Sequence, residues 1–154
     1  MDDMLRELYQ EVILDHGKNP RNFRHPEDAT CKADGNNPLC GDQLTVYAKV
    51  GDDQTIKDVA FEGRGCAISL ASASMMTEIA SGKSISQVQN LFDLFHKLCT
   101  GEEEGMVPDE FADDIEKLRV MSGVRQFPMR VKCATLAWHA IHAAVTGENN
   151  ASTE

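Results

Sequence analysis

The sequence contains no long apolar run. A membrane-spanning helix needs about 18 or more consecutive apolar residues, and no such stretch occurs in the 154 residues of the chain. The first residues, Met1 to Arg6, also lack the basic start and apolar segment of a secretory signal peptide. We therefore expect a cytoplasmic protein without a membrane partner.

Basic residues are scarce relative to acidic ones. The chain has 15 Lys and Arg residues against 25 Asp and Glu residues, which gives a formal net charge of -10. This negative balance repels the phosphate backbone, so we expect no nucleic acid as a partner. A metal ion or the basic surface of another protein is easier to accommodate.

Internal repeats and domain linkers are also absent from the sequence. The chain has 42% hydrophobic and 26% charged residues, which is near the average for globular proteins, and its length suits one domain. We expect a single domain over residues 1–147 and a frayed polar tail over residues 148–154.

Hydrophobic periodicity predicts an α+β fold, in which a small antiparallel sheet is packed against several helices. Alternating apolar residues on both sides of Gly51-Asp52-Asp53 indicate a β-hairpin. Ser86 and Gln89 have the spacing of a capping box at a helix start. The expected elements in chain order are helix 5–16, a loop over 19–38 with a short edge strand at 29–34, strands 44–50 and 55–61, helices 66–81 and 86–100, an acidic turn at 102–105, helix 108–121, and a last helix from about residue 132.

Five cysteines are present, but no C-x-x-C pair, so the spacing typical of zinc fingers is missing. Cys40, Cys66 and Cys133 nevertheless share a local setting, because each stands beside glycine or basic residues where a loop meets a regular element. A helix N-terminus would favour a thiolate at Cys66, and we expect the same at Cys133, where Arg130 and Lys132 add positive charge. Thiolate is the form that binds a metal or attacks sulfur.

Asp42 follows Cys40 by two residues, and Gly41 between them can bend the chain so that both side chains face one point. The simpler interpretation of a free cysteine is a small buried hydrophobe, and we keep it for Cys31 and Cys99. We interpret the five histidines in the same way, as structural residues. Spacing alone leaves a three-cysteine metal site open and does not establish it.

Four groups of motifs follow one another along the chain. They are Asp15-His16 with Asn19-Pro20-Arg21-Asn22, then Asn37-Pro38-Leu39-Cys40-Gly41-Asp42, then Gly65-Cys66-Ala67-Ile68-Ser69 with Ala71-Ser72-Ala73-Ser74, and finally Lys132-Cys133-Ala134-Thr135-Leu136. This ordered set resembles the IscU, SufU and NifU-N-terminal family of iron–sulfur cluster assembly scaffolds over about residues 5–145. The resemblance implies a SufE/NifU-like fold.

Two features make the sequence more similar to the SufU branch of that family. One is an extra helical segment over about residues 101–123, and the other is Lys132 before Cys133, where the IscU branch has a histidine. The SufU-like resemblance implies bound Zn²⁺, with a SufS-like cysteine desulfurase and downstream iron–sulfur acceptor proteins as partners. The implied metal ligands are Cys40, Asp42, Cys66 and Cys133.

We assign the role of sulfur acceptor to Cys40, because its Gly41 loop looks freer than the helix-anchored positions of the other two cysteines. Arg130 or Lys132 would offset part of the negative charge of the ligands. The predicted activity is at most that of a sulfurtransferase acting with a cysteine desulfurase. Two alternatives stay open: a scaffold on which a labile [2Fe–2S] or [4Fe–4S] cluster is built and passed on, and a structural zinc domain.

Overall fold

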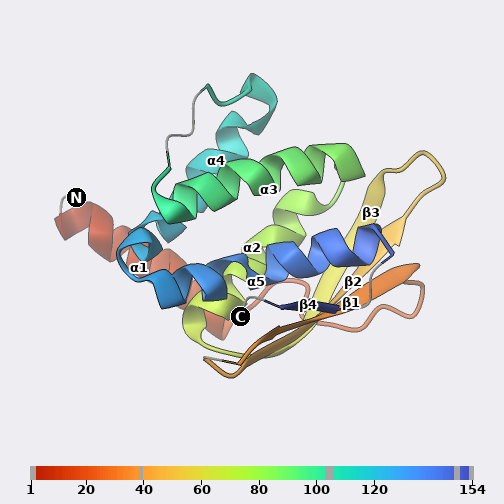
Figure 1. Cartoon of the computed structure of the whole chain (residues 1–154), viewed down its shortest axis with the longest axis horizontal. Helices are drawn as coiled ribbons and strands as arrows, with labels where there is room; N and C mark the ends of the chain where they lie inside the picture. The colour runs from red at the N-terminus through yellow and green to blue at the C-terminus, as the bar shows by residue number, and fades with distance from the viewer. Residues whose placement is uncertain (1–2, 39, 103–105, 148–149, 153–154) are drawn as a thin grey trace.

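A four-stranded sheet lies on one side of a layer of helices (Figure 1). The computed structural model describes residues 3–38, 40–102, 106–147 and 150–152. The elements are α1 (Asp3–Lys18), β1 (Cys31–Asn37), β2 (Asp42–Val50), β3 (Ile56–Arg64), α2 (Ala67–Ala80), α3 (Ile85–Thr100), the 3₁₀ helix η1 (Asp109–Phe111), α4 (Ala112–Leu118), the 3₁₀ helix η2 (Arg119–Gln126), α5 (Pro128–Val145) and β4 (Asn150–Ser152). The predicted α+β fold is confirmed. Within the described ranges no helix is long and apolar enough to cross a membrane.

The sheet has the order β3-β2-β1-β4. β1 pairs antiparallel with β2, and β2 pairs antiparallel with β3, which is the hairpin that the alternation predicted. β4 pairs parallel with β1 at residues 34–36. This pairing lies in the stretch predicted as a frayed tail, and backbone pairing of this kind leaves no signal in a polar sequence. Residues 148–149 and 153–154 of that tail, and residues 103–105 of the predicted acidic turn, lie outside the described residues.

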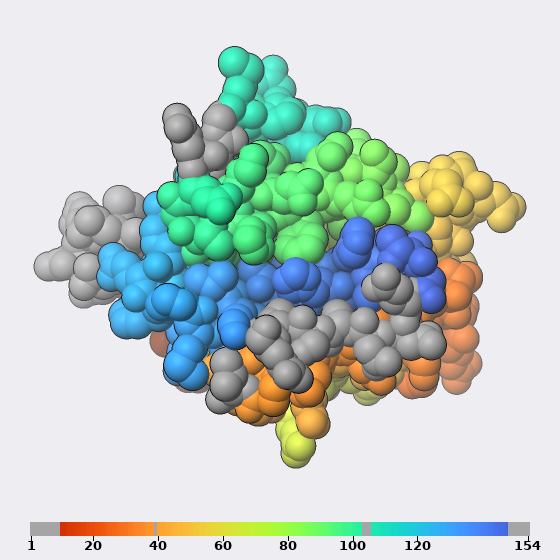
Figure 2. Space-filling model, viewed as in Figure 1, coloured from red at the N-terminus to blue at the C-terminus, as the bar shows by residue number. Residues whose placement is uncertain are grey.

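Helices α2 and α5 form the centre of the helical layer. α5 packs across β1 and β2, while α2 packs against α1, α5 and β3. Small side chains at residues 71–74 of α2 are fully buried and allow its neighbours to approach closely. Trp138 of α5 is fully buried and lies 5.2 Å from Phe95 of α3, measured between ring centroids. In the space-filling view α5 is the blue band between the green α3 and the orange β1 region (Figure 2).

Gly35 in β1 permits the close approach of α5. A Cβ atom at this position would lie 3.3 Å from Ala140 Cβ and 3.3 Å from Leu136 Cδ1. Side chains alternate along a strand, so the next inward position after Gly35 is Asn37. Asn37 therefore faces Cys133, which precedes Leu136 by one helical turn.

Two predicted helix starts are wrong. α5 begins at Pro128 and not near Lys132, because proline is well tolerated in the first turn of a helix, where its missing N–H is not needed. Cys133 therefore lies in the second turn, and the predicted stabilisation of its thiolate by helix N-terminal amides is wrong.

α3 is capped by Ser84 with Gln87 and not by Ser86 with Gln89.

Replacing Ser84 with alanine should lower the free energy of unfolding by about 1 kcal/mol, because the Gln87 N–H at the start of α3 loses its acceptor, the Ser84 hydroxyl. Urea denaturation would measure the change. Ser86→Ala is the matched control, since Ser86 is exposed in the first turn and its loss should cost less than about 0.5 kcal/mol. Equal losses for both variants would contradict the assignment of the cap.

The helix predicted over residues 108–121 is divided into three pieces, namely η1, α4 and η2. Its apolar face is as predicted, because Phe111, Ile115 and Leu118 are buried. Apolar spacing of three and four residues does not distinguish 3₁₀ from α-helix, and Gly123 has a low helix propensity, so the sequence did not indicate the division.

Candidate metal centre

The hairpin of β1 and β2 carries the first part of the site. Asn37 and Asp42 are cross-strand partners at its end, and both side chains are fully buried. Cys40 lies in the connecting turn, in which Gly41 has a φ of 71°, a left-handed conformation that glycine adopts without strain. This turn brings the Cys40 thiol and the Asp42 carboxylate to the same point, as the sequence predicted.

The connection from β3 to α2 passes close to Asp42. The backbone N–H of Cys66 donates to Asp42 Oδ1 at 2.9 Å. Gly65 makes this approach possible, because a Cβ atom there would lie 2.6 Å from the same carboxylate oxygen. Cys66 is also the N-cap of α2, and its Sγ accepts a hydrogen bond from the Ser69 N–H at 3.4 Å. The predicted position of Cys66 at a helix start is confirmed.

Cys133 enters the site from α5. Its side chain is fully buried, and its thiol donates to the Met129 carbonyl at 3.7 Å. Burial raises the pKa of Cys133 well above its usual range, and the neighbouring Cys40, Asp42 and Cys66 raise it further. A bound cation is what would hold this sulfur as a thiolate.

Three of the four predicted ligands converge. The sulfurs of Cys40 and Cys133 and a carboxylate oxygen of Asp42 all lie within 4.8 Å of one another. Zn–S bonds of about 2.3 Å in a tetrahedral site separate neighbouring sulfurs by roughly 3.8 Å, so the three groups need only a small contraction to bind zinc. Cys66 is not part of this group of three, but its thiol lies close enough to Cys133 to raise the pKa of that residue.

A pocket of about 670 Å³ opens over the site, lined by Cys40, Cys66 and residues 126–130. Phe127 and Met129 in its wall are 60% and 54% exposed. The two half-buried cysteines therefore face an accessible pocket, whereas Asp42 and Cys133 are sealed from solvent.

Arg130 is the basic residue that lies next to the thiols. A hydrogen bond with Cys133 raises the pKa of Arg130, and electrostatic interactions with Cys66, Cys133 and Cys40 raise it further. The Lys132 side chain makes no hydrogen bond or ion pair with the part of the chain that the structure describes. Of the two basic residues that the sequence suggested, Arg130 is thus the one that lies next to the cysteines.

The remaining cysteines lie outside this cluster. Cys99 is fully buried on the apolar face of α3, and burial raises its pKa to about 12, so the thiol stays protonated. Cys31 in β1 donates to the Ala48 carbonyl at 3.6 Å, and burial raises its pKa as well. The buried apolar position predicted for Cys99 is confirmed, and both residues serve as controls for the site.

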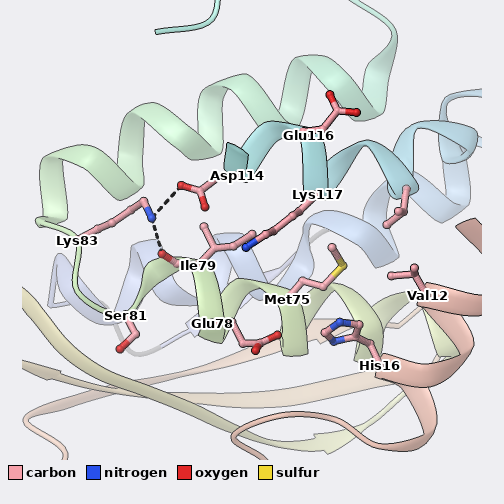
Figure 3. A pocket seen from close by; sticks show the side chains of 11 residues that line it. Val12, His16, Met75, Glu78, Ile79, Ser81, Lys83, Asp114, Glu116 and Lys117 are labelled. Carbon is pink, nitrogen blue, oxygen red and sulfur yellow. Dashed lines mark hydrogen bonds and ion pairs between the residues drawn. The ribbon is translucent and has the colours of Figure 1, made fainter. Parts of the chain in front are cut away.

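A second pocket, of about 400 Å³, lies between α1, α2 and α4 and has no cysteine among its lining residues (Figure 3). At one end the Lys83 ammonium pairs with Asp114 at 2.9 Å and donates to the Ile79 carbonyl at 2.7 Å. At the other end His16 shares a hydrogen bond with Ser74 Oγ, and burial lowers the pKa of His16. The ion pair ties α4 to the turn that follows α2.

Asn37 is a residue of this candidate site for which the sequence predicted no role. The predicted edge strand ended at residue 34, so Asn37 was assigned to a loop. Extending the alternation of inward positions from Ala33 through Gly35 to residue 37 would have indicated a buried polar side chain beside the cysteine turn.

Comparisons with known proteins agree with this architecture. A family model described as NifU-like N terminal domain matches residues 8–106. The zinc-dependent sulfurtransferase SufU of Bacillus subtilis (strain 168) is 40% identical over 141 residues, which cover 92% of this chain and 91% of that protein. The iron–sulfur cluster assembly scaffold protein IscU of Streptococcus pyogenes serotype M1 is 38% identical over 147 residues, with coverages of 96% and 88%.

Solved structures show the same fold. An iron–sulfur cluster assembly scaffold protein for the SUF system from Fervidobacterium islandicum AW-1 aligns with a TM-score of 0.79 and 33% identity, over 91% of this chain and 98% of that one. A NifU-like N-terminal structure from Brucella abortus, at 23% identity and a TM-score of 0.77, aligns over 93% and 95% of the two chains. The chain belongs to the iron–sulfur cluster assembly family of IscU, SufU and the NifU N-terminal domain. The family predicted from the ordered motifs is therefore confirmed.

Proposed function

We propose that this chain is a zinc-bound sulfur acceptor that takes persulfide sulfur from a SufS-like cysteine desulfurase and passes it on toward iron–sulfur acceptor proteins. The observation that supports this most directly is the convergence of Cys40, Asp42 and Cys133 within 4.8 Å beneath an open pocket. The 40% identity to a relative named as a zinc-dependent sulfurtransferase supports it as well.

The donor set suits zinc. Thiolate and carboxylate ligands in a group of four are typical of Zn²⁺ sites, whereas Mg²⁺ and Ca²⁺ require mostly oxygen ligands. The residues that would hold the ion are Cys40, Asp42, Cys66 and Cys133. When bound, Zn²⁺ supplies positive charge that keeps the thiols deprotonated. Three thiolates and one carboxylate around Zn²⁺ leave a net charge of about -2, which Arg130 lies close enough to reduce.

Cys40 is the cysteine best placed to receive sulfur. Cys133 is sealed in the core, and Cys66 caps α2 through its sulfur, but the Cys40 sulfur caps no helix and faces the pocket. Its thiolate attacks the outer sulfur of the persulfide on the desulfurase. A new S–S bond forms on Cys40 as the S–S bond of the donor breaks, and the donor cysteine leaves as a thiolate. The transferred sulfur keeps any proton that it carries.

Asp42 has a different role, because a carboxylate cannot take up sulfane sulfur. Its Oδ1 is held by the Cys66 N–H, so its position does not depend on Cys40. We assign it to retention of the metal while Cys40 is engaged in transfer.

Elemental analysis of the purified chain, combined with desulfurase turnover, tests the proposal. We expect about one zinc per chain in a colourless protein, and faster release of sulfur from cysteine when the chain is added to the enzyme. A brown protein that holds iron and sulfide after anaerobic reconstitution, without an effect on turnover, would favour the labile-cluster scaffold, the role named for the IscU relative. Zinc without any effect on turnover would favour a structural zinc domain.

A further inference from the structure

We infer that Asn37 is a positioning residue that holds Asp42 and Cys133 in place from beneath the metal centre. Its amide Nδ2 donates to Asp42 Oδ2 at 3.3 Å and to Cys133 Sγ at 3.5 Å. All three side chains are fully buried. The inference rests on the proposed zinc site and adds a residue that governs how firmly this site keeps its metal.

Strand pairing, a backbone hydrogen bond and the packing of α5 together fix the position of Asn37. Asn37 is the cross-strand partner of Asp42, and its carbonyl accepts a hydrogen bond from the Cys40 N–H at 3.3 Å. Gly35 allows α5 to pack closely, which sets Cys133 opposite the Asn37 side chain. One residue thus contacts three of the four ligands, Cys40 through the backbone and the other two through its amide.

The hydrogen bonds of the Asn37 side chain are made by its donor group, Nδ2. Asn37 Oδ1 is buried and accepts no hydrogen bond from the described residues, whereas Nδ2 donates twice. A buried acceptor without a partner is unfavourable, so a purely space-filling role would favour an apolar side chain of the same size. The reverse orientation would aim Oδ1 at a carboxylate and a sulfur, which are both acceptors.

A neutral donor is also what the charge of the site requires. The ligands carry more negative charge than a divalent ion neutralises, so an acidic residue at position 37 would add repulsion. An amide stabilises the carboxylate and the sulfur without changing the net charge. Second ligand spheres that orient and stabilise the ligands in this way typically raise metal affinity about 10- to 100-fold.

The arrangement divides the ligands into two pairs. Asp42 is held on both oxygens, by the Cys66 N–H and by Asn37, and Cys133 is held by Asn37, while Cys40 and Cys66 face the pocket. The buried pair, Asp42 and Cys133, would therefore hold the metal while Cys40 is engaged in transfer. Asn37 should accordingly control zinc release and not the uptake of sulfur.

Zinc release from Asn37→Leu and Asn37→Asp chains, followed with a chromophoric chelator, tests this inference. Asn37→Leu keeps the approximate size without donors, and Asn37→Asp adds a charge. We expect zinc to dissociate about 10- to 100-fold faster from both, together with a changed absorption spectrum of the Co²⁺-substituted chain. The matched control is Asn36→Leu, because Asn36 is the exposed neighbour on the other face of β1, and its rate should stay within about twofold of the wild type.

The outcomes separate the inference from the proposed function. Wild-type chain that retains no zinc overturns both, whereas zinc retained equally by wild type and Asn37→Leu overturns only the role of Asn37. Faster release from Asn37→Asp alone would reflect the added charge and also contradict the inference. Circular dichroism of the metal-free chains adds the last check, because variants that do not fold without metal would assign Asn37 a structural role and overturn the inference.

Discussion

Replacing Cys40 with alanine should reduce desulfurase turnover to the level measured without this chain. The alanine side chain cannot accept sulfur. Among the described residues the other two thiols of the site are less available, since Cys133 is fully buried and the sulfur of Cys66, although at the pocket, caps α2. Asp42→Ala should instead leave sulfur acceptance measurable and chiefly weaken the metal, because both thiolate and carboxylate bind zinc but only the thiolate takes up sulfur.

Bound zinc and turnover should be measured together for these variants. Cys31→Ala and Cys99→Ala are the matched controls, because both residues lie outside the cluster and burial raises their pKa. Neither control should change zinc content or turnover. A Cys40→Ala chain that still accelerates the desulfurase normally would contradict the assignment of the sulfur acceptor.

Replacing Gly65 with alanine should weaken zinc binding by about 10- to 100-fold, the range observed when groups that orient a ligand are disturbed. The added methyl group would lie 2.6 Å from Asp42 Oδ1 and 3.2 Å from its Cγ, so the carboxylate must move away from the Cys66 N–H. Isothermal titration of the metal-free chain with Zn²⁺ would measure the loss.

Gly123→Ala is the control for this change, because a Cβ atom at residue 123 would meet nothing within 4 Å. Its zinc affinity should equal that of the wild type. If Gly65→Ala also binds zinc with wild-type affinity, then the position of Asp42 does not determine metal binding and its role as a ligand is wrong.

The candidate metal centre illustrates what local sequence can and cannot predict. The pairing of Cys40 with Asp42 followed from their two-residue separation around Gly41, because a single turn decides it. Cys133 is more than ninety positions further along the chain, and its approach to Asp42 depends on how α5 lies across the sheet. The spacing of residues along the chain does not give the packing of α5 on the sheet, so the prediction that Cys133 joins the site rested on the order of the motifs.

The secondary structure shows the same contrast: elements that depend on local sequence were predicted, and those that depend on distant contacts were not. Strong alternation predicted the hairpin, and small residues predicted α2. The start of α5 was placed too late, at about residue 132, because proline more often interrupts a helix than lies inside it, although it is also well tolerated in the first turn. β4 was not predicted, because it pairs with β1, which is distant in the sequence, and the pairing is made by backbone atoms.

Lys83 and Asp114 place a constraint on how the length of this chain can change in evolution. The segment over about residues 101–123, which resembles the SufU branch, carries Asp114 and the buried Phe111, Ile115 and Leu118. Deleting it would remove the counter-ion of Lys83, whose side chain is 20% exposed in the intact chain, and would uncover the apolar core beneath. The segment is therefore part of the folded core, and a shorter chain would need other residues to cover the apolar side chains that Phe111, Ile115 and Leu118 now contact.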